Sequence, residues 1–261
     1  MSARVTQERK GHLLLIGLDR PEKRNAFDLS MIAELAGAYQ RLADDREIRV
    51  AVLFAHGDHF SAGLDLAELS PALAARGPEA LSGAGRYDPF GVWGEPAPKP
   101  VVLAVNGIAL TLSIELALAA DIVVASEDVR FRQLEVGRGI LPFAGATLRA
   151  PVQLGWGNAM RFLLTADDFG AEEAKRIGLV QEITPVGRHV DRAVEIAETI
   201  ARQAPLGVQG TLANARIARA AAEQAAIAHL RALLPSILGS EDAGEGLRSF
   251  AERRVGRFRG K

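Results

Sequence analysis

The chain has 261 residues, of which 48% are hydrophobic and 24% are charged, as is typical of a globular protein with a substantial core. Its 31 basic and 32 acidic side chains nearly balance, so composition gives no electrostatic reason to expect nucleic acid as the main partner. The absence of cysteine excludes a disulfide framework and a thiolate nucleophile.

The sequence also lacks the usual signs of a membrane or secreted protein. Residues 1–20 alternate charged and apolar side chains, and their only continuous apolar stretch is too short for a secretory signal. No stretch approaches the roughly 20 apolar residues that a membrane-spanning helix needs. We therefore expect a cytoplasmic protein with no membrane partner.

The first elements are predicted to be a hairpin and a helix. Residues 4–8 and 12–19 flank a short segment that contains a glycine, which is a hairpin signal. Apolar residues then recur at helical spacing from Met31 to Leu42, which predicts an amphipathic helix that begins near Ser30.

Strand and helix patterns continue to alternate through the middle of the chain. Residues 50–57 and 101–107 predict buried strands. The second of these leads into an apolar helix that ends near Ala120, and residues 121–126 and 129–135 predict two further strands. This recurrence of strand, loop and helix favours an α/β layer structure.

Two later regions differ in composition from this α/β pattern. Residues 82–100 are rich in glycine and proline and carry Tyr87, Phe90 and Trp93, and long loops of this kind tend to be functional or mobile. From about Val190 onward the chain becomes alanine-rich and helical in pattern. We therefore expect a boundary near that residue, between an α/β core and an all-helical tail.

Several weaker signals do not predict a site. His56, Asp58 and His59 lie close together, but no His or Cys pair at a zinc spacing stands elsewhere to complete a metal site. The glycine-rich segment 137–145 matches neither common nucleotide fingerprint, and no G-x-S-x-G motif occurs. The basic residues at 253–261 resemble a solvated chain end, with phosphate binding as their functional alternative. No metal site is predicted.

Two glutamates are better candidates for chemistry. Glu115 interrupts the apolar run from Ile108 to Ala120, where a charged carboxylate is costly unless it is paired or used. Glu135 follows an alternating strand and also has no acidic neighbours. Two carboxylates, together with backbone N–H groups from glycine-bearing turns, are what the addition of water to a conjugated thioester requires.

As a set, these segments resemble the crotonase or enoyl-CoA hydratase/isomerase superfamily, over nearly the whole chain. The motifs are RPEKRNAFD (20–28), FSAGLDL (60–66), KPVVLAVNG (99–107), IELALAADI (114–122), FRQLEVG (131–137), TADDFGAEEAKRIGLV (165–180) and FRGK (258–261). The resemblance implies an α/β spiral core of repeated ββα units over residues 1–190. It also implies a C-terminal all-helical oligomerisation region over residues 191–261, through which the chain forms a homotrimer or a dimer of trimers.

The resemblance further implies a coenzyme A thioester as substrate, with no separate cofactor. Glu115 matches the family glutamate that holds and activates water, and Glu135 matches the one that exchanges a proton with the substrate's α carbon. Ala62 and Leu112 match the two positions whose backbone N–H groups bind the thioester oxygen. An alternative for Glu115 is a structural ion pair, with Arg132 or Arg138 as its partner.

The same resemblance implies the binding residues. The expected coenzyme A site comprises Arg24, Ala26, Ala62, Gly63, Leu64 and Asp65, with Phe258 and Lys261 reaching it from the tail. The family commonly has a glycine triplet at residues 111–113, which are Thr, Leu and Ser here, so either the backbone there stays in an ordinary region or the acyl pocket is reshaped. We expect Phe90 and Trp93 to form one wall of that pocket opposite Leu112. The alternative is that these aromatics fill the core or a trimer contact.

Retention of both glutamates favours hydration of a trans-2-enoyl-CoA to a 3-hydroxyacyl-CoA. A double-bond isomerase of the family typically keeps the match to Glu135 but not the match to Glu115, and it is the alternative along with other acyl-CoA enzymes of the superfamily. Some relatives bind RNA through a lysine-rich helix. The corresponding residues 172–178 are mixed in charge, so no nucleic-acid partner is expected.

Overall fold

The computed structural model describes residues 3–81, 85–259 and 261. Its strands are β1 Val5–Lys10, β2 Leu13–Leu18, β3 Val50–Ala55, β4 Val101–Val105, β5 Ile108–Leu110, β6 Ile122–Ser126, β7 Arg130–Arg132, β8 Phe169–Gly170 and β9 Glu182–Thr184. Its α-helices are α1 Leu29–Asp44, α2 Leu66–Arg76, α3 Leu112–Ala119, α4 Ala146–Gln153, α5 Trp156–Thr165, α6 Ala171–Arg176, α7 His189–Ala201, α8 Pro205–Leu238 and α9 Glu241–Ala251. Short 3-10 helices are η1 Pro21–Lys23, η2 Gly77–Leu81 and η3 Glu135–Arg138.

Two sheets of mixed direction organise these elements. The larger sheet has the order β1-β2-β3-β4-β6-β9, and the smaller has the order β5-β7-β8. The predicted hairpin β1–β2 is antiparallel and turns at Gly11, whereas the other neighbouring strands of the larger sheet, β2, β3, β4, β6 and β9, pair in parallel. The expected α/β fold class, with helices at the C-terminal end, is confirmed.

The larger sheet is covered on both faces. In β3, Ala51 and Leu53 face the main core, while Val50 and Val52 join a second apolar cluster with residues of α7. This alternation follows from the two-residue side-chain period of a strand, and it explains why β3 reads as a nearly continuous apolar run. The main core also takes in the buried face of α1, whose N-cap Asp28 accepts the backbone N–H of Met31 at 2.7 Å.

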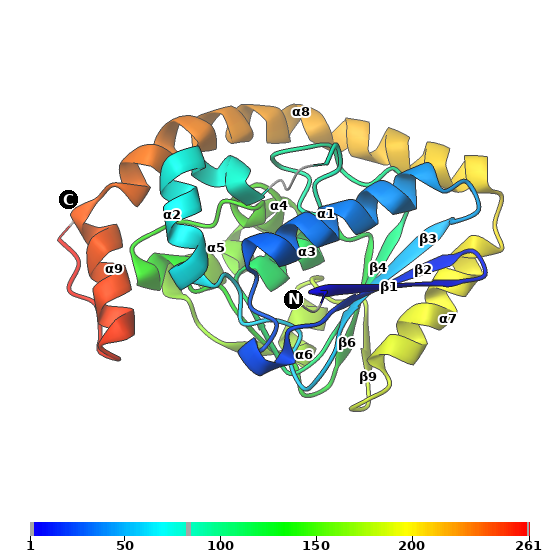
Figure 1. Cartoon of the computed structure of the whole chain (residues 1–261), viewed down its shortest axis with the longest axis horizontal. Helices are drawn as coiled ribbons and strands as arrows, with labels where there is room; N and C mark the ends of the chain where they lie inside the picture. Colours follow the sequence, from blue (N-terminus) through cyan, green and yellow to red (C-terminus); the bar gives the residue numbers. More distant parts are fainter. Residues whose placement is uncertain (1–2, 82–84, 260) are drawn as a thin grey trace.

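The predicted boundary between residues 190 and 191 lies inside α7. Because α7 packs on β3, β4 and β6, it belongs by contact with the α/β core. The helices beyond it are arranged differently: α8 runs along one side of the molecule past α1 and α2, and α9 lies at the far end with the C-terminus (Figure 1). The division into two domains remains a prediction, and the packing moves its boundary to the start of α8.

The smaller sheet brings the two predicted catalytic segments together. β5 pairs in parallel with β7, with Ile108 opposite Arg130 and Leu110 opposite Arg132. The segments that follow, α3 with Glu115 and η3 with Glu135, therefore start side by side. The Thr111 N–H donates to the Arg132 carbonyl at 2.9 Å across this junction. None of the helices in the described residues is long and apolar enough to cross a membrane.

Candidate active site

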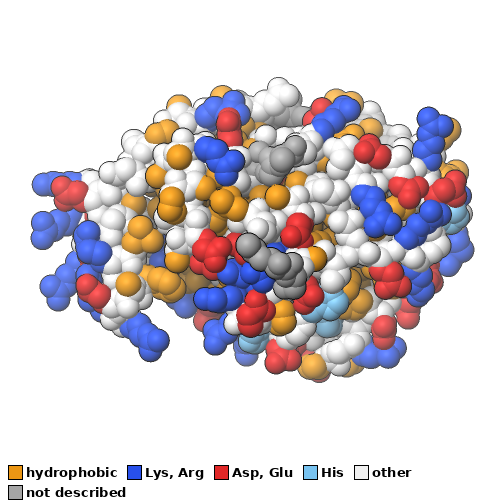
Figure 2. Space-filling model, viewed as in Figure 1, with side chains coloured by type: hydrophobic (Ala, Val, Ile, Leu, Met, Phe, Trp, Pro, Cys, Tyr) orange, Lys and Arg blue, Asp and Glu red, His pale blue; other side chains and the backbone are white. Residues whose placement is uncertain are grey.

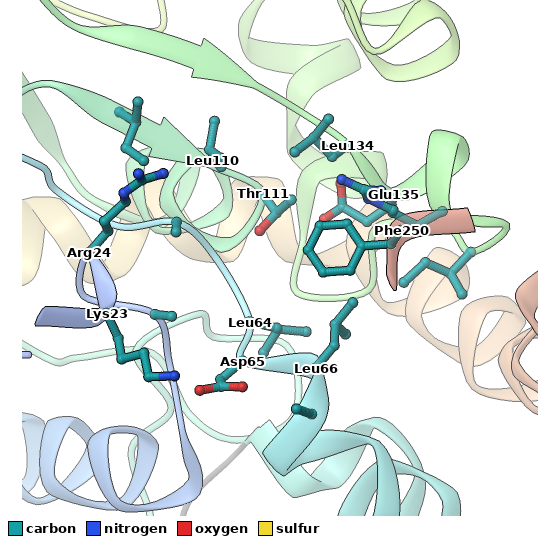
Figure 3. A pocket seen from close by; sticks show the side chains of 16 residues that line it. Lys23, Arg24, Leu64, Asp65, Leu66, Leu110, Thr111, Leu134, Glu135 and Phe250 are labelled. Atoms are coloured by element: carbon teal, nitrogen blue, oxygen red, sulfur yellow. The ribbon is translucent and has the colours of Figure 1, made fainter. Parts of the chain in front are cut away.

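A cavity of about 390 Å³ lies where the loop 61–65, the start of α3 and η3 meet. Figure 3 shows Lys23 and Arg24 at one end of it and Glu135 and Phe250 at the other, with Thr111 between them. The sequence-predicted residues that line it are Arg24, Ala26, Ala62, Leu64, Asp65 and Glu135. The structure thus brings together most of the predicted coenzyme A residues and one of the two predicted glutamates.

The two glutamates are held differently. Glu135 lines the cavity at 6% exposure; its Oε1 accepts the side-chain amide of Gln133 at 3.0 Å, and its Oε2 has no partner among the described residues. Glu115 lies behind the cavity wall at 1% exposure. Its Oε1 accepts the backbone N–H groups of Ala144 and Ala146 at 2.8 and 3.0 Å.

Burial raises the pKa of both carboxyl groups. It raises the pKa of Glu115 to about 7, against the opposing effects of the two backbone N–H groups and of the Arg149 charge. Burial raises the pKa of Glu135 well above its ordinary value, and the neighbouring charge of Glu115 raises it further. Because Glu115 has two N–H donors and a nearby cation, it is the better stabilised anion. These contacts favour the ionised form of Glu115, and the charge of Glu115 in turn favours the protonated form of Glu135.

Neither arginine proposed as a structural partner pairs with Glu115. Arg132 lies 3.5 Å from Asp168, and the Arg138 guanidinium stacks over the Phe250 ring at 4.1 Å. The alternative prediction of an ion pair with either of them is therefore wrong.

The loop that precedes α2, residues 61–65, has one backbone N–H group without an acceptor. The Ala62 N–H donates to the Arg24 carbonyl at 2.9 Å, the Gly63 N–H donates to Ser61 Oγ at 3.0 Å, and the Asp65 N–H donates to the Phe27 carbonyl at 2.9 Å. The Leu64 N–H has no acceptor within the described chain. The prediction for Ala62 as an oxyanion donor is thus corrected, because its hydrogen is already used, and Leu64 becomes the candidate.

A second N–H of the same kind lies at the start of α3. Leu112 is the first residue of that helix, and the first N–H groups of a helix lack intrahelical partners. No described residue accepts this hydrogen. The side chain of Leu112 is buried and is not part of the cavity wall, so the predicted contact of that side chain with the acyl group is wrong.

The missing glycine triplet changes the cavity at Thr111 instead. Leu112 and Ser113 are helical, whereas Thr111 has φ 48° and ψ −106°, a strained conformation for a β-branched residue. Thr111 lines the cavity, and its hydroxyl oxygen is buried without a partner among the described residues. The strain falls on one residue, and that residue reshapes the pocket.

The predicted aromatic wall of the acyl pocket is also wrong. Phe90 is 1% exposed and packs edge-to-face on Phe27, while Trp93 donates its ring N–H to the Phe143 carbonyl at 2.9 Å. Asp88 accepts three backbone N–H groups of their loop, from residues 90, 92 and 93, which holds Phe90 in the core and the half-buried Trp93 against it. The alternative interpretation, in which these aromatics fill the core, is the one that the packing favours.

The chain end also lies away from the cavity. Phe258 is 42% exposed, and the backbone carbonyl of Lys261 accepts the Asp242 N–H at 3.0 Å. The tail therefore folds back against the start of α9, and neither residue lines the cavity. Their predicted contact with coenzyme A finds no support within a single chain. Gly63, similarly, is buried beneath its neighbours in the loop and does not line the cavity.

The lining residues Lys23, Arg138, Ile140 and Phe250 were not predicted to contact the substrate, whereas the missing glycine triplet pointed to Thr111. Lys23 lies inside the motif at residues 20–28 and Arg138 directly follows the motif at 131–137, and these positions were the only signal that either lines the cavity. Phe250 comes from α9, more than a hundred residues away along the chain, so only tertiary structure places it there.

A second cavity, of about 500 Å³, adjoins the first. Leu66, Arg138 and Ile140 line both cavities. Its other walls come from α2, the end of α8 and α9, and apart from Ser70 they are apolar or glycine. In the surface view, hydrophobic side chains are exposed next to the end of the molecule where Lys and Arg side chains gather (Figure 2).

No group of three or more His, Cys, Asp or Glu suited to a metal ion occurs within the described residues.

Comparison with known proteins agrees with this arrangement. The profile of the enoyl-CoA hydratase/isomerase family matches residues 8–261. A 2,3-dehydroadipyl-CoA hydratase from Escherichia coli K12 is 33% identical over 258 residues, which cover 97% of this chain and 97% of that protein. A solved structure of a probable enoyl-CoA hydratase/isomerase from Mycobacterium abscessus is 52% identical over 99% of both chains, with a TM-score of 0.78. A carnitinyl-CoA hydratase from Mycobacterium avium is 32% identical over 100% of both chains, with a TM-score of 0.87.

Proposed function

Because the chain belongs to the enoyl-CoA hydratase/isomerase family, we propose that it adds water to a trans-2-enoyl-CoA to give a 3-hydroxyacyl-CoA. The observation that carries this proposal is a pair of buried carboxyls, Glu135 at one end of the cavity and Glu115 behind its wall, in which the charge of Glu115 raises the pKa of Glu135. The surroundings of Glu115 favour its ionised form and those of Glu135 favour its protonated form, as a base and an acid that act together require.

The substrate is oriented by the charges of the cavity. Lys23 and Arg24 are its cationic residues at the end away from Glu135, and they are suited to the phosphates of coenzyme A (Figure 3). The acyl group then passes Thr111 and reaches Glu135. Beyond it lies the second cavity, whose apolar walls replace the predicted Phe90 and Trp93 wall as the acyl site.

The chemical step follows from the two protonation states. Ionised Glu115 accepts a proton from water while the water oxygen bonds to the β carbon of the enoyl group. Protonated Glu135 gives its proton to the α carbon. The two carbon atoms of the double bond thereby gain the elements of water, and proton transfer from Glu115 back to Glu135 restores the resting state. This assignment requires Glu115 to reach the cavity through a water molecule, since its side chain lies behind the wall.

The negative charge that builds on the thioester oxygen needs donors. The N–H groups of Leu64, which lines the cavity, and of Leu112, which follows the lining residue Thr111, both lack an acceptor in the described chain. Two such donors, fixed before the substrate arrives, stabilise the enolate without any reorganisation of the protein.

One observation favours double-bond isomerisation as the second candidate. Of the two glutamates only Glu135 lines the cavity, and a single glutamate suffices to move a proton between the α carbon and the γ carbon. An isomerase would convert a 3-enoyl-CoA to the conjugated isomer and would not need Glu115 as a base.

The deciding experiment follows the conjugated chromophore. Hydration of a trans-2-enoyl-CoA removes it, whereas isomerisation of a 3-enoyl-CoA creates it. We expect loss of the chromophore with the wild-type protein and a decrease in turnover of ~10²–10⁴-fold in both Glu115→Gln and Glu135→Gln. A Glu115→Gln variant that retains full turnover, with only the 3-enoyl substrate consumed, would establish the isomerase instead.

A further inference from the structure

Arg138 occupies the passage between the two cavities. It is the last residue of η3, three residues after Glu135, and it lines both the catalytic cavity and the apolar one. Its two companions in that passage, Leu66 and Ile140, are apolar. Because Arg138 contacts Phe250, which lies with Glu135 at the end of the cavity opposite Lys23 and Arg24, a cation stands at that end (Figure 3).

This arginine lacks the acidic partner that other arginines around the site have. Arg20 lies 2.9 Å from Asp65 and 3.0 Å from Glu68, and Arg132 lies 3.5 Å from Asp168. Within the described residues, no carboxylate lies within ion-pair distance of Arg138, and no hydrogen-bond acceptor takes its guanidinium hydrogens. Burial and the charge of Arg132 both lower the pKa of Arg138, which shows that the surroundings disfavour its charge.

The contact that Arg138 does make leaves its hydrogen-bonding edge available. Its guanidinium carbon lies over the Phe250 ring at 4.1 Å from the centroid. A cation–π contact of this kind holds the guanidinium at the ring without pairing its N–H groups with a carboxylate. That geometry presents a fork of donors, which matches the two oxygens of a carboxylate.

The cation is also on the wrong side of the reacting carbons to bind the phosphates of coenzyme A. In the proposed function those phosphates bind Lys23 and Arg24 at the other end, which puts the thioester and double bond between the two ends. A substrate anion that meets Arg138 in this arrangement belongs to the acyl group. In this mostly apolar passage an ion pair is worth more than in water, because the local dielectric constant is lower.

We propose that the substrate's acyl group carries a carboxylate beyond its double bond and that Arg138 binds it, so that the substrate is the coenzyme A monothioester of an unsaturated dicarboxylic acid. This inference rests on the proposed function, because it takes the cavity next to Glu135 as the acyl site. Phe250 holds the guanidinium in place, and the apolar walls contact the methylene groups between the two ends.

The test compares two trans-2-enoyl-CoA substrates of equal chain length, one ending in a methyl group and one in a carboxylate. The measured quantity is the ratio of their kcat/KM values. We expect the wild-type protein to prefer the carboxylate. Arg138→Met should lower that ratio by ~10–100-fold, the usual range for losing a hydrogen-bonded charged partner. Arg138→Lys should retain part of the preference. Arg132→Gln, which changes an arginine that lines neither cavity, should leave the ratio as it is.

Binding of the two saturated acyl-CoA analogues, measured by calorimetry, separates this inference from the proposed reaction. If the enzyme hydrates enoyl-CoA but Arg138→Met has the wild-type ratio, the carboxylate inference is overturned and hydration stands. If neither substrate is hydrated, hydration is rejected. The inference is still upheld in that case if the wild-type protein binds the carboxylate analogue more tightly and Arg138→Met loses this preference. Equal binding of both analogues by the wild-type protein overturns it in either case.

Discussion

Thr111 packs against Gly63 so tightly that a β-carbon on Gly63 would overlap the threonine hydroxyl. The two residues belong to the two segments that carry the free N–H groups of Leu64 and Leu112. Gly63 also has φ 88°, a region that residues with a β-carbon avoid. The spacing between the proposed oxyanion donors is therefore set by a glycine on one side and a strained threonine on the other.

Gly63→Ala should disturb this spacing. We expect a loss of stability of about 1–3 kcal/mol, from the positive φ and the overlap together. We also expect kcat to fall by ~10²–10³-fold, as when one oxyanion donor is removed. Thermal unfolding and steady-state kinetics measure the two effects. The double variant Gly63→Ala with Thr111→Gly removes the overlap, so it should recover part of both, and a double variant no better than the single one would contradict this account.

The pH dependence of activity follows from the unequal protonation of the two carboxyls. Glu115 must be ionised to accept a proton from water, so kcat/KM should rise with pH up to its pKa of about 7. Glu135 must keep its proton, so kcat/KM should fall at a higher pH where that group ionises. The profile from about pH 5 to about pH 9 tests this, and the rising limb should disappear in Glu115→Gln. A flat wild-type profile would contradict the assignment.

The free energy of unfolding should also depend on the ionisation of Glu115, but it should fall with rising pH where kcat/KM increases. The pKa of Glu115 is about 7 in the folded protein and about 4.5 when exposed, so the folded state binds this proton more tightly. The free energy of unfolding therefore decreases as the pH rises from about 4.5 to about 7. Glu115→Gln should become more stable than the wild type across that window, by on the order of 3 kcal/mol at its upper end. Glu47→Gln, at an exposed position, is the matched control, and urea unfolding at several pH values is the measurement.

Much of this architecture could be predicted because it depends on local patterns. The hairpin, the α1 helix and the β3 strand follow from side-chain periodicity, and the cost of burying Glu115 in an apolar run identified it as an unusual residue. The donor in the loop 61–65 was misplaced by two residues, because a motif does not show which N–H groups neighbouring carbonyls already use. Only the bonds from Ala62 to Arg24 and from Asp65 to Phe27 reveal that Leu64 remains.

The acyl site could not be predicted for a different reason. Apolar residues in a loop look alike whether they face a ligand or the core, and Asp88, which turns Phe90 inward, has no distinctive pattern. The actual walls come from α2, α8 and α9, which are distant in sequence, so their proximity depends on how the helices pack.

The core position of Phe90 gives a prediction opposite to the one from sequence. Phe90→Ala should lower the free energy of unfolding by about 3–5 kcal/mol, because it leaves a cavity beside Phe27. Activity should fall equally for short and long acyl groups at temperatures where the variant is folded. Calorimetric melting and a chain-length profile check these two outcomes, and a selective loss for long substrates would restore Phe90 to the acyl site.

Leu73, on α2, should control how long an acyl group the enzyme accepts. Its side chain lines the second cavity, and replacing it with phenylalanine fills space that is empty in the unliganded protein, so little strain is expected. Leu73→Phe should therefore lower kcat/KM for long acyl groups by ~10-fold or more while short ones are affected little, since each methylene excluded from an apolar site costs ~1 kcal/mol. Ala75→Phe places the same ring at an exposed position of the same helix that lines neither cavity, and it should leave the profile unaltered. If Leu73→Phe lowers kcat/KM equally for all chain lengths, the acyl group does not enter this cavity, and its apolar walls serve another purpose.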